Sequence, residues 1–310
     1  MINKMSEELN IPVDSLSDTI EQSRSFVKRI KINKKSGGER IVYQPARKIK
    51  VIQYWLMRTI FSKITIHSAS MAYRKEGSIK ENALKHSNGG YFLKLDFKDF
   101  FPSIKFSDLN KSIIAFRKNN NAIFKYTKAD QELIRRVCFY KNDKLPIGYP
   151  SSPIISNIVM YKFDIRVTDE MPKFRKYGNV VYTRYADDMI FSTDRKGGCE
   201  KIFSFLSVLI NSWSTPSLLL NEAKTRFVSS SGGTAIVTGL RICYDGHITL
   251  HRHYKDIVRL LLSLYKKGNL KEEDVYVLKG HLSYIQNVDS VFYTKICKKY
   301  FDIIDEIKTK

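Results

Sequence analysis

The segment YTRYADDMIF, residues 182–191, places two adjacent aspartates between two runs of strand-forming residues. Because β-branched and aromatic residues lie on both sides, we expect Asp187 and Asp188 at the turn of a β-hairpin. Adjacent carboxylates repel each other. In a partly buried site they require a bound cation or a proton, since like charges sharing a site raise the pKa of one of them. The chain must therefore fold so that positive charge reaches this turn.

A third aspartate follows another predicted strand. In YFLKLD, residues 91–96, side chains alternate between two faces, and Pro102 ends the pattern. Asp96 is therefore expected at the carboxyl end of a strand, where open sheets commonly carry their chemistry. A helix cap or a turn is the alternative role for an aspartate in such a place.

Together the three aspartates predict a metal site. Carboxylate oxygens with few His or Cys partners suit Mg²⁺. Two such ions about 3.5–4 Å apart can activate a hydroxyl and stabilise the leaving oxygen in phosphoryl transfer. We expect two Mg²⁺ ions, which Mn²⁺ could replace. A general acid and base pair, as in a glycosidase, is the alternative use of the same carboxylates.

The charge of the chain favours phosphate chemistry over the glycosidase alternative. Fifty-three Lys and Arg residues against 31 Asp and Glu give a net charge of +22, as expected for a protein that neutralises nucleic-acid phosphates. The sequence has no run of 18 apolar residues and no secretory signal. We therefore expect a cytoplasmic protein with no membrane partner.

The cysteines favour neither a disulfide framework nor a zinc site. All four are far apart in the sequence and form no CxxC pair. In HITLHRHY, a possible strand would bring His251 and His253 to one side, with Cys243 nearby. No fourth ligand is evident, so exposed or RNA-facing histidines are the favoured interpretation and a zinc site is the alternative.

Basic residues gather between residues 24 and 58, around a β-hairpin predicted at 27–45. Its Ser-Gly-Gly turn suits the positive φ angles of a tight hairpin and would place Lys34, Lys35 and Arg40 near the tip. The stretch is a candidate surface for binding anions. An amphipathic helix is expected to follow the hairpin.

Helices are also expected in the second half of the chain. A Gly- and Pro-rich loop at 145–153 leads into a helix that Ser151 or Ser152 would cap. After the aspartate hairpin, short strands with Gly turns precede a change of character at Tyr254. From there the apolar periodicity predicts a small lobe of three helices.

Three ordered segments now carry a resemblance to a known family. LDFKDFFPSI, PIGYPSSPIISN and the aromatic-Ala-Asp-Asp turn, in this order and spacing, resemble the reverse transcriptases from about residue 26 to the C-terminus. The resemblance implies RNA-directed DNA polymerase activity, which is a nucleotidyltransferase reaction. It also implies an α+β right-hand polymerase fold with fingers, an antiparallel palm and a helical thumb. The implied regions are fingers at 1–90, a palm with a fingers insertion at 91–240, and an RNA-binding thumb at 241–310.

The resemblance also implies roles for individual residues at the metal site. Asp96 and Asp187 match the main metal ligands of the family, and the backbone carbonyl of Phe97 matches a further one. Asp188 matches the second carboxylate of the turn. Lys224, in NEAKTRF, matches a lysine proposed to protonate the leaving pyrophosphate, although an exposed strand lysine is the alternative.

Further residues match the nucleotide site of the family. Phe101 matches the aromatic steric gate that excludes a ribose 2′-OH, which implies dNTP substrates, with an ordinary core aromatic as the alternative. Gly148 matches the glycine that lets the backbone approach the nucleotide, and Ile147 stands where glutamine is often found. The fingers residues that would hold the triphosphate are Lys34, Lys35 and Arg40.

Two shorter segments, NALKH at 82–86 and VTG at 237–239, resemble motifs of the retron reverse transcriptases. That likeness implies a cognate structured non-coding RNA, priming from the 2′-OH of an internal guanosine, and a cDNA product left branched on the RNA. It also implies a separate effector protein in anti-phage defence. The residues expected to contact RNA are Asn82, His86, Val237, Thr238, Gly239, Arg252, His253, Arg259, Lys266 and Lys267.

Two alternatives to a retron enzyme remain open on the sequence. One is a reverse transcriptase of another lineage, such as an abortive-infection, diversity-generating or group II intron-like type. The other is an RNA-DNA-bound scaffold that restrains a toxic effector. The sequence shows no evident maturase, endonuclease, ribonuclease H or protease segment, which favours the retron interpretation.

Overall fold

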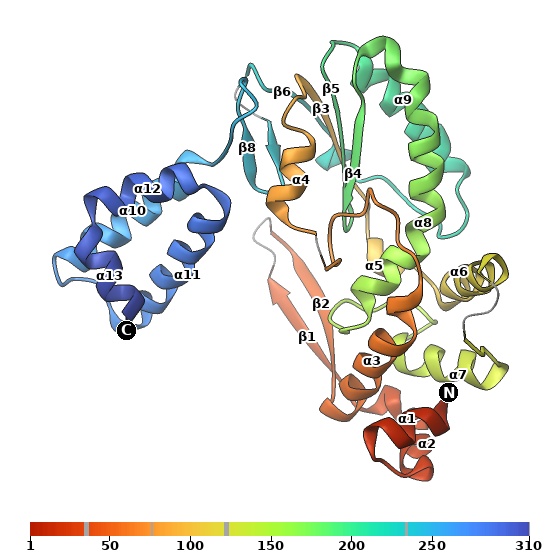
Figure 1. Ribbon diagram of the computed structural model, residues 1–310. Helices are drawn as coiled ribbons and strands as arrows, with labels where there is room; N and C mark the ends of the chain where they lie inside the picture. Colours follow the sequence, from red (N-terminus) through yellow and green to blue (C-terminus); the bar gives the residue numbers. More distant parts are fainter. Residues whose placement is uncertain (34–36, 76, 121–123, 233–234, 310) are drawn as a thin grey trace.

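The structure is a computed structural model that describes residues 1–33, 37–75, 77–120, 124–232 and 235–309. The described residues form three antiparallel sheets, of two, four and three strands, together with helices (Figure 1). Figure 1 shows a projecting hairpin, a central sheet covered by helices, and a helical lobe that carries the C-terminus. The α+β class predicted from the sequence is therefore confirmed.

Helices from the N-terminal part of the chain and from residues 106–138 form a base, from which the β1–β2 hairpin projects. The predicted hairpin is present as β1 (Val27–Asn33) and β2 (Glu39–Pro45), with Gly37 and Gly38 at φ 87° and 80° in its turn. Lys34 and Lys35, expected near its tip, lie outside the described residues. The helices of the base are α1 (Ile2–Leu9), α2 (Val13–Glu21), α3 (Arg47–Thr59), α6 (Phe106–Asn119) and α7 (Lys128–Cys138).

The central sheet has the strand order β4-β5-β3-β6, and all neighbours are antiparallel. Leu93 and Leu95 face a large core that includes residues of α8 and α9, whereas Phe92 faces a second core on the other side. This alternation is the one predicted for residues 91–96. The elements are β3 (Tyr91–Asp96), β4 (Val181–Tyr185), β5 (Asp188–Thr193), β6 (Arg226–Ser229), α8 (Ser152–Glu170) and α9 (Gly198–Ser212).

The helical lobe differs from the three helices predicted. The described residues form four: α10 (Arg252–Lys266), α11 (Glu272–Val288), α12 (Ser290–Lys299) and α13 (Phe301–Thr309). Tyr300 has non-helical backbone angles, φ −131° and ψ 37°, so the last predicted helix is divided in two. None of the helices in the described ranges has the length and apolar character needed to cross a lipid bilayer.

A three-stranded sheet precedes this lobe, formed by β7 (Ile236–Val237), β8 (Leu240–Ile242) and β9 (Ile248–Leu250). The expected boundary between residues 240 and 241 therefore falls inside β8. His251 is the N-cap of α10, and its Nδ1 accepts a hydrogen bond from the backbone N–H of His253 at 3.3 Å. The strand predicted through both histidines is wrong, because β9 ends at Leu250.

The NALKH and VTG segments pack against each other. Helix α4 (Ile79–Lys85) places Ala83 in the same core as Val237, and the Thr238 hydroxyl donates a 3.0 Å hydrogen bond to the Ile79 carbonyl. Asn82, like Val237, has 0% exposed surface. The two segments are thus two sides of one internal contact.

His86 anchors the end of α4 to the central sheet. Its Nδ1 lies 2.7 Å from the Ser192 hydroxyl and its Nε2 lies 2.7 Å from the Thr183 hydroxyl, while the side chain is 0% exposed. Burial lowers the pKa of His86 to about 3, so the ring is neutral at ordinary pH.

The buried positions do not fit direct RNA binding by Asn82, His86 or Val237. A side chain with no exposed surface cannot contact RNA, so the sequence expectation for these three residues is corrected to an internal packing role. Gly239 is exposed, with φ 84° in the turn between β7 and β8, and Thr238 is half-buried.

The buried neutral imidazole of His86 should make stability depend on pH. An unfolded histidine takes up a proton below pH 6.5, whereas folded His86 does so only near pH 3, so acid favours the unfolded state. Between pH 7 and pH 5 this one group should lower the free energy of unfolding by about 2 kcal/mol. The measurement is chemical unfolding of the wild type and His86→Gln at both pH values.

His86→Gln should remove that part of the pH dependence. The exposed His253 provides the matched control, because His253→Gln changes the same chemistry without altering the buried contact. Equal pH dependence in the wild type and His86→Gln would contradict the assignment.

Candidate active site

The β4–β5 hairpin brings the three aspartates to one end of the central sheet. Asp188 begins β5 and pairs in register with Asp96 at the end of β3. The Phe97 N–H donates a 3.2 Å hydrogen bond to the Asp187 carbonyl across the same end. Ala186, directly before the aspartates, has φ 60°, a left-handed conformation that closes the tight turn. The turn predicted from the sequence is therefore present.

A fully buried ion pair is hydrogen-bonded to this turn. The Arg184 guanidinium donates to both Asp164 carboxylate oxygens, at 2.9 and 2.6 Å, and neither side chain has exposed surface. A third guanidinium nitrogen donates to the Ala186 carbonyl at 3.0 Å, and the Tyr182 hydroxyl donates to Asp164 at 2.7 Å. The pair thus joins α8 to β4 and to the turn residue beside Asp187.

Sequence reasoning missed this pair. Two signals could have found it: Asp164 follows the also buried Asn157 by seven residues on the inward face of an apolar helix, and Arg184 lies on a predicted strand beside two acids. Charged residues are almost never fully buried unless they are paired, so each of these positions asks for a partner. Only the packing of α8 on β4 identifies each as the partner of the other.

The carboxylates of the turn resist ionisation. The Asp188 side chain is exposed at the surface, although many protein atoms surround its carboxylate. Loss of water, together with the charges of Asp187 and Asp96, raises the pKa of Asp188 to about 6. Desolvation and the charge of Asp96 also raise the pKa of Asp187. A bound cation would reverse both shifts, because it favours the charged form.

Asp96 is already engaged by two side chains. Its Oδ1 accepts a 3.1 Å hydrogen bond from the Asn221 amide, and its Oδ2 accepts a 2.8 Å bond from the Lys224 ammonium. Hydrogen bonding to Asp96 raises the pKa of Lys224, whose side chain is 57% exposed. In this arrangement Lys224 offsets negative charge at the sheet end and is a weaker acid than an ordinary lysine.

The donor set fits a hard cation, although the carboxylates are not fully gathered. Asp96, Asp187 and Asp188 offer oxygen atoms, which suit Mg²⁺. Among the described residues, the group of ligand atoms that all lie within 4.8 Å of one another is at another place in the fold. The oxygens of the three aspartates therefore do not lie that close together. The hydrogen bonds of Asp96 to Asn221 and Lys224 account for the direction of that carboxylate.

The group that does meet this distance lies at the β8–β9 turn. Ligand atoms of Cys243, Asp245 and His247 lie within 4.8 Å of one another, and the latter two residues are exposed. The zinc alternative considered from the sequence used His251 and His253 instead of Asp245 and His247. The side chain of Cys243 is the one feature that the two sets share.

Two residues face the aspartates from the N-terminal part of the chain. Arg40 lies close enough to lower the pKa of Asp187, which opposes the larger upward effect of desolvation. Tyr73, with φ 59° and 49% exposure, has a pKa raised by burial and by the charge of Asp187. The sequence analysis did not single out Tyr73; an aromatic residue beside a basic one, in AYRK, was the available signal.

Phe101 lies close to the sheet end in the chain. It belongs to the short helix α5 (Phe100–Ser103), which begins four residues after Asp96. Its ring is half-buried and meets the ring of Phe100 edge-on at 5.5 Å. The Phe97 side chain is buried, and its ring stacks on that of Phe100 at 5.7 Å.

Gly148 packs directly against the β1–β2 hairpin. A Cβ at Gly148, which has φ 103°, would lie 2.5 Å from the Val42 side chain and 2.7 Å from the Tyr43 carbonyl. The Tyr43 N–H also donates a 2.8 Å bond to the carbonyl of Ile147. The missing side chain of Gly148 thus lets β2 pack on this loop, and its role at the nucleotide stays a prediction. The neighbouring Ile147 contributes its backbone to the same contact.

The predicted RNA-binding residues of the lobe are exposed, and two of them pair with an acidic side chain. Arg259 donates a 2.6 Å bond to Asp256 and lies over the Phe292 ring at 5.0 Å, and Arg252 is 3.8 Å from the same carboxylate. Solvent reaches all five members of the set, which are Arg252, His253, Arg259, Lys266 and Lys267.

Comparisons with known proteins place this geometry in a family. The family described as "Reverse transcriptase (RNA-dependent DNA polymerase)" matches residues 32–262. The Retron Ec73 reverse transcriptase of Escherichia coli is 44% identical over 283 residues, covering 91% of this chain and 89% of that protein. The Retron Ec86 reverse transcriptase of Escherichia coli is 30% identical over 309 residues, covering 96% and 90%.

Solved structures agree at the level of the fold. The structure of apo telomerase from Candida tropicalis superposes with a TM-score of 0.54 at 14% identity, over 90% of this chain. The chain spans 58% of the length of that telomerase chain. At this identity the likeness concerns the polymerase fold alone.

The buried Arg184–Asp164 pair should affect two separate quantities: the free energy of unfolding and the metal affinity of the turn. Asp164→Asn leaves a buried guanidinium charge without its partner and should lower the free energy of unfolding by about 3–5 kcal/mol. The double variant Arg184→Met with Asp164→Leu should recover most of that loss, because it removes both charges. Chemical unfolding of the wild type and both variants measures the two effects.

Although its stability is recovered, the double variant should bind Mn²⁺ about tenfold more weakly than the wild type. The Ala186 carbonyl loses the charged donor that positions the turn beside Asp187. Electron paramagnetic resonance during a Mn²⁺ titration measures this. Wild-type affinity in a stable double variant would mean that Arg184 does not position the turn.

Gly148→Ala should displace the β1–β2 hairpin. The added methyl group meets Tyr43 backbone in a conformation that already disfavours alanine, so a loss of about 1–3 kcal/mol is expected from strain alone. Gly268→Ala is the matched control, because Gly268 also has positive φ, 70°, but open space around it. Fluorescent dNTP binding should weaken in Gly148→Ala and not in Gly268→Ala; equal affinities would contradict the contact.

Proposed function

The chain belongs to the retron reverse transcriptases and is an RNA-directed DNA polymerase, and on that premise we propose that Asp96, Asp187 and Asp188 form its polymerase site. The observation that carries the proposal is the register of the sheet, which sets Asp96 opposite Asp188 with the turn residue Asp187 beside them. Three acids at one end of a sheet, in a chain of net charge +22, need a specific purpose.

Two Mg²⁺ ions would be held by these carboxylates and by the Phe97 carbonyl, with Mn²⁺ able to replace them. When bound, they would supply activation of the attacking hydroxyl and stabilisation of the leaving pyrophosphate oxygen. The raised pKa values of Asp187 and Asp188 support this proposal, since a neighbouring cation stabilises the ionised form of both. Arg184 holds the turn in place for that purpose.

The incoming dNTP would lie between the hairpin and the aspartates. Arg40, together with Lys34 and Lys35, would bind the triphosphate, and the influence of Arg40 on Asp187 supports this placement. The ring of Phe101 would occupy the space that a ribose 2′-OH needs, which selects deoxynucleotides. The packing of Gly148 on β2 would hold the hairpin at the right distance.

Lys224 would hold a proton near the leaving group. Its ammonium is bound to Asp96 at 2.8 Å, so it would act on pyrophosphate only after leaving that carboxylate. Its side chain is more than half exposed, which allows that movement. A cation binding Asp96 would release the lysine, because both compete for the same oxygen.

The RNA would be bound across all three regions. Fingers would comprise residues 1–90, the palm 91–239 with α6 and α7 as a fingers insertion, and the thumb 240–310, because the expected boundary between 240 and 241 would divide β8. The exposed cations of α10 would contact phosphates of a structured non-coding RNA. Arg252 and Arg259 would exchange Asp256 for phosphate oxygens.

The enzyme would prime from the 2′-OH of an internal guanosine in its cognate RNA. The product would be single-stranded cDNA joined to the RNA by a 2′-5′ branch. Likeness to the retron family supports these steps and a separate effector protein in anti-phage defence. The four cysteines, none in a disulfide, fit a cytoplasmic site of action.

Nucleic acid purified with the protein tests the proposal. The wild type should carry RNA linked to DNA by a 2′-5′ branch, whereas Asp187→Asn should carry RNA without DNA, because removal of one ligand carboxylate abolishes catalysis. The measurement is sequencing of the bound nucleic acid before and after treatment with a debranching enzyme. Mg²⁺-dependent primer extension by the purified proteins gives the matching activity.

Lys201→Gln, an exposed change on α9, serves as the control and should carry the same branched product as the wild type. Untemplated or protein-primed DNA would indicate another lineage. Wild-type extension by Asp187→Asn would refute the site.

A further inference from the structure

The turn between β8 and β9 brings three metal-ligating side chains together. Cys243, Asp245 and His247 each offer one ligand atom, and the three atoms all lie within 4.8 Å of one another. In the part of the chain that the structure describes, no other set of three His, Cys, Asp or Glu side chains meets this distance. The fold therefore places a sulfur, an oxygen and a nitrogen donor side by side at this turn.

The register of the hairpin explains why the thiol and the imidazole meet. Ile242 pairs with Ile248, so Cys243 and His247 are the next two residues to face each other. The Cys243 N–H donates a 2.8 Å hydrogen bond to the His247 carbonyl, and the Gly246 N–H donates a 3.0 Å bond to the Cys243 carbonyl. Residues directly opposite in an antiparallel pair have Cβ atoms about 4.5–5.5 Å apart. The backbone thus sets the short separation of these two ligands.

Asp245 lies between them at the tip of the turn. Its Oδ1 accepts a 3.1 Å hydrogen bond from the His247 N–H, which leaves the other carboxylate oxygen for a metal ion. None of the ion pairs among the described residues uses this carboxylate. Asp245 and His247 are exposed and Cys243 is half-buried, so an ion from solution can reach all three.

The turn rests on the segment that follows α4. Gly246 has φ 78°, and a Cβ there would lie 3.2 Å from the Ser87 carbonyl, so only glycine allows this approach. Ser87 follows His86, which is bonded to two strands of the central sheet. The strands β7, β8 and β9 have only two, three and three residues. An ion at the turn would stabilise a sheet that makes few hydrogen bonds of its own.

The mixed donor set identifies the class of metal. Sulfur and imidazole ligands together with one carboxylate suit Zn²⁺, whereas Mg²⁺ and Ca²⁺ prefer oxygen alone. Around a tetrahedral Zn²⁺ with these ligands, the ligand atoms lie about 3.3–3.8 Å apart. Rotation of exposed side chains can supply the small closure that this geometry requires. Three protein ligands leave the fourth position to water.

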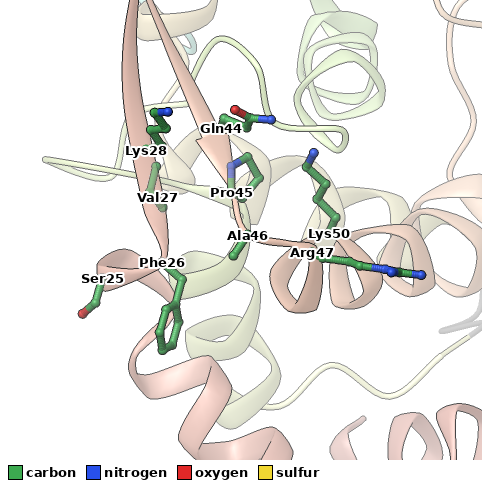
Figure 2. A pocket seen from close by; sticks show the side chains of 9 residues that line it. All are labelled: Ser25, Phe26, Val27, Lys28, Gln44, Pro45, Ala46, Arg47 and Lys50. Carbon is green, nitrogen blue, oxygen red and sulfur yellow. The ribbon is translucent and has the colours of Figure 1, made fainter.

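Two other charged regions do not offer such a site. The aspartates of the candidate active site provide oxygen atoms only. A pocket of about 710 Å³ at the base of the β1–β2 hairpin has Lys28, Arg47 and Lys50 among its lining residues and no acid, so it repels cations (Figure 2). A metal ion that prefers sulfur and nitrogen is therefore directed to the β8–β9 turn.

We propose that Cys243, Asp245 and His247 bind one Zn²⁺ ion, which stabilises the β8–β9 turn at a site separate from the polymerase aspartates. As the Zn–S bond forms, the Cys243 thiol releases its proton to water, and neither sulfur nor zinc changes its oxidation state. The imidazole binds in its neutral form. The ion has a structural role that goes beyond the proposed function and does not depend on it.

Co²⁺ is the probe that tests the proposal, because it replaces Zn²⁺ and its bond to a thiolate absorbs light. The titration is done with the full chain under reducing conditions and with excess Mg²⁺, which occupies sites made of oxygen alone. The wild type should bind one Co²⁺ with thiolate absorption, and one equivalent of Zn²⁺ should abolish that absorption. Cys243→Ser should lack it, and His247→Gln should bind Co²⁺ at least about tenfold more weakly.

Matched variants separate this turn from the rest of the chain. Cys297→Ser removes another half-buried thiol and His253→Gln removes another exposed imidazole, so both should bind Co²⁺ as the wild type does. Asp187→Asn should also keep the thiolate absorption, even though primer extension is lost. Failure of the polymerase proposal would therefore leave this test intact.

Thermal unfolding gives a second measurement. Added Zn²⁺ should raise the Tm of the wild type and of Cys297→Ser, but not that of Cys243→Ser, because only the folded turn gathers the ligands. Circular dichroism should show that every variant is folded. Absence of thiolate absorption in the wild type, or its persistence in Cys243→Ser, would overturn the proposal. So would its loss in His253→Gln but not in His247→Gln.

Discussion

The buried pair of Arg184 and Asp164 is the constraint on which the turn of the proposed metal site depends. Removing two charges from water is costly, and the pair is tolerated because the guanidinium is bidentate and Tyr182 satisfies the same carboxylate. Its use is geometric, since the remaining guanidinium nitrogen holds the Ala186 carbonyl directly before the aspartates. A strained left-handed residue in a tight turn keeps its conformation only when its surroundings hold it. The adjacent acids therefore repel each other within a turn that cannot relax to separate them.

Contact between the hairpin and the central part of the chain is a second constraint. The Tyr43 N–H bonds to the Ile147 carbonyl, and Gly148 admits β2 at a distance that no side chain would allow. This contact brings a basic hairpin toward an acidic sheet end, so that Arg40 moderates the charge of Asp187.

The segments that resemble retron motifs act inside the fold. Helix α4 is bonded through His86 to two strands of the central sheet and through the Ile79 carbonyl to Thr238. Ala83 joins the core that the helical lobe shares with the three-stranded sheet. These segments therefore link the catalytic sheet to the lobe that would contact RNA, and their effect on RNA binding would be indirect.

The sequence by itself determined most of the local elements and indicated which residue types form the candidate site. Alternation and turn residues were enough to predict the two hairpins and the strand that ends at Asp96, because such patterns depend on neighbours in the chain. The sequence did not predict that Arg184 meets Asp164, that Gly148 packs on Tyr43, or that His86 is buried. Each of these depends on which distant elements pack together, and burial and partner choice are properties of the packed fold. The division of the last helix at Tyr300 was missed for the same reason, since apolar periodicity continues across the bend.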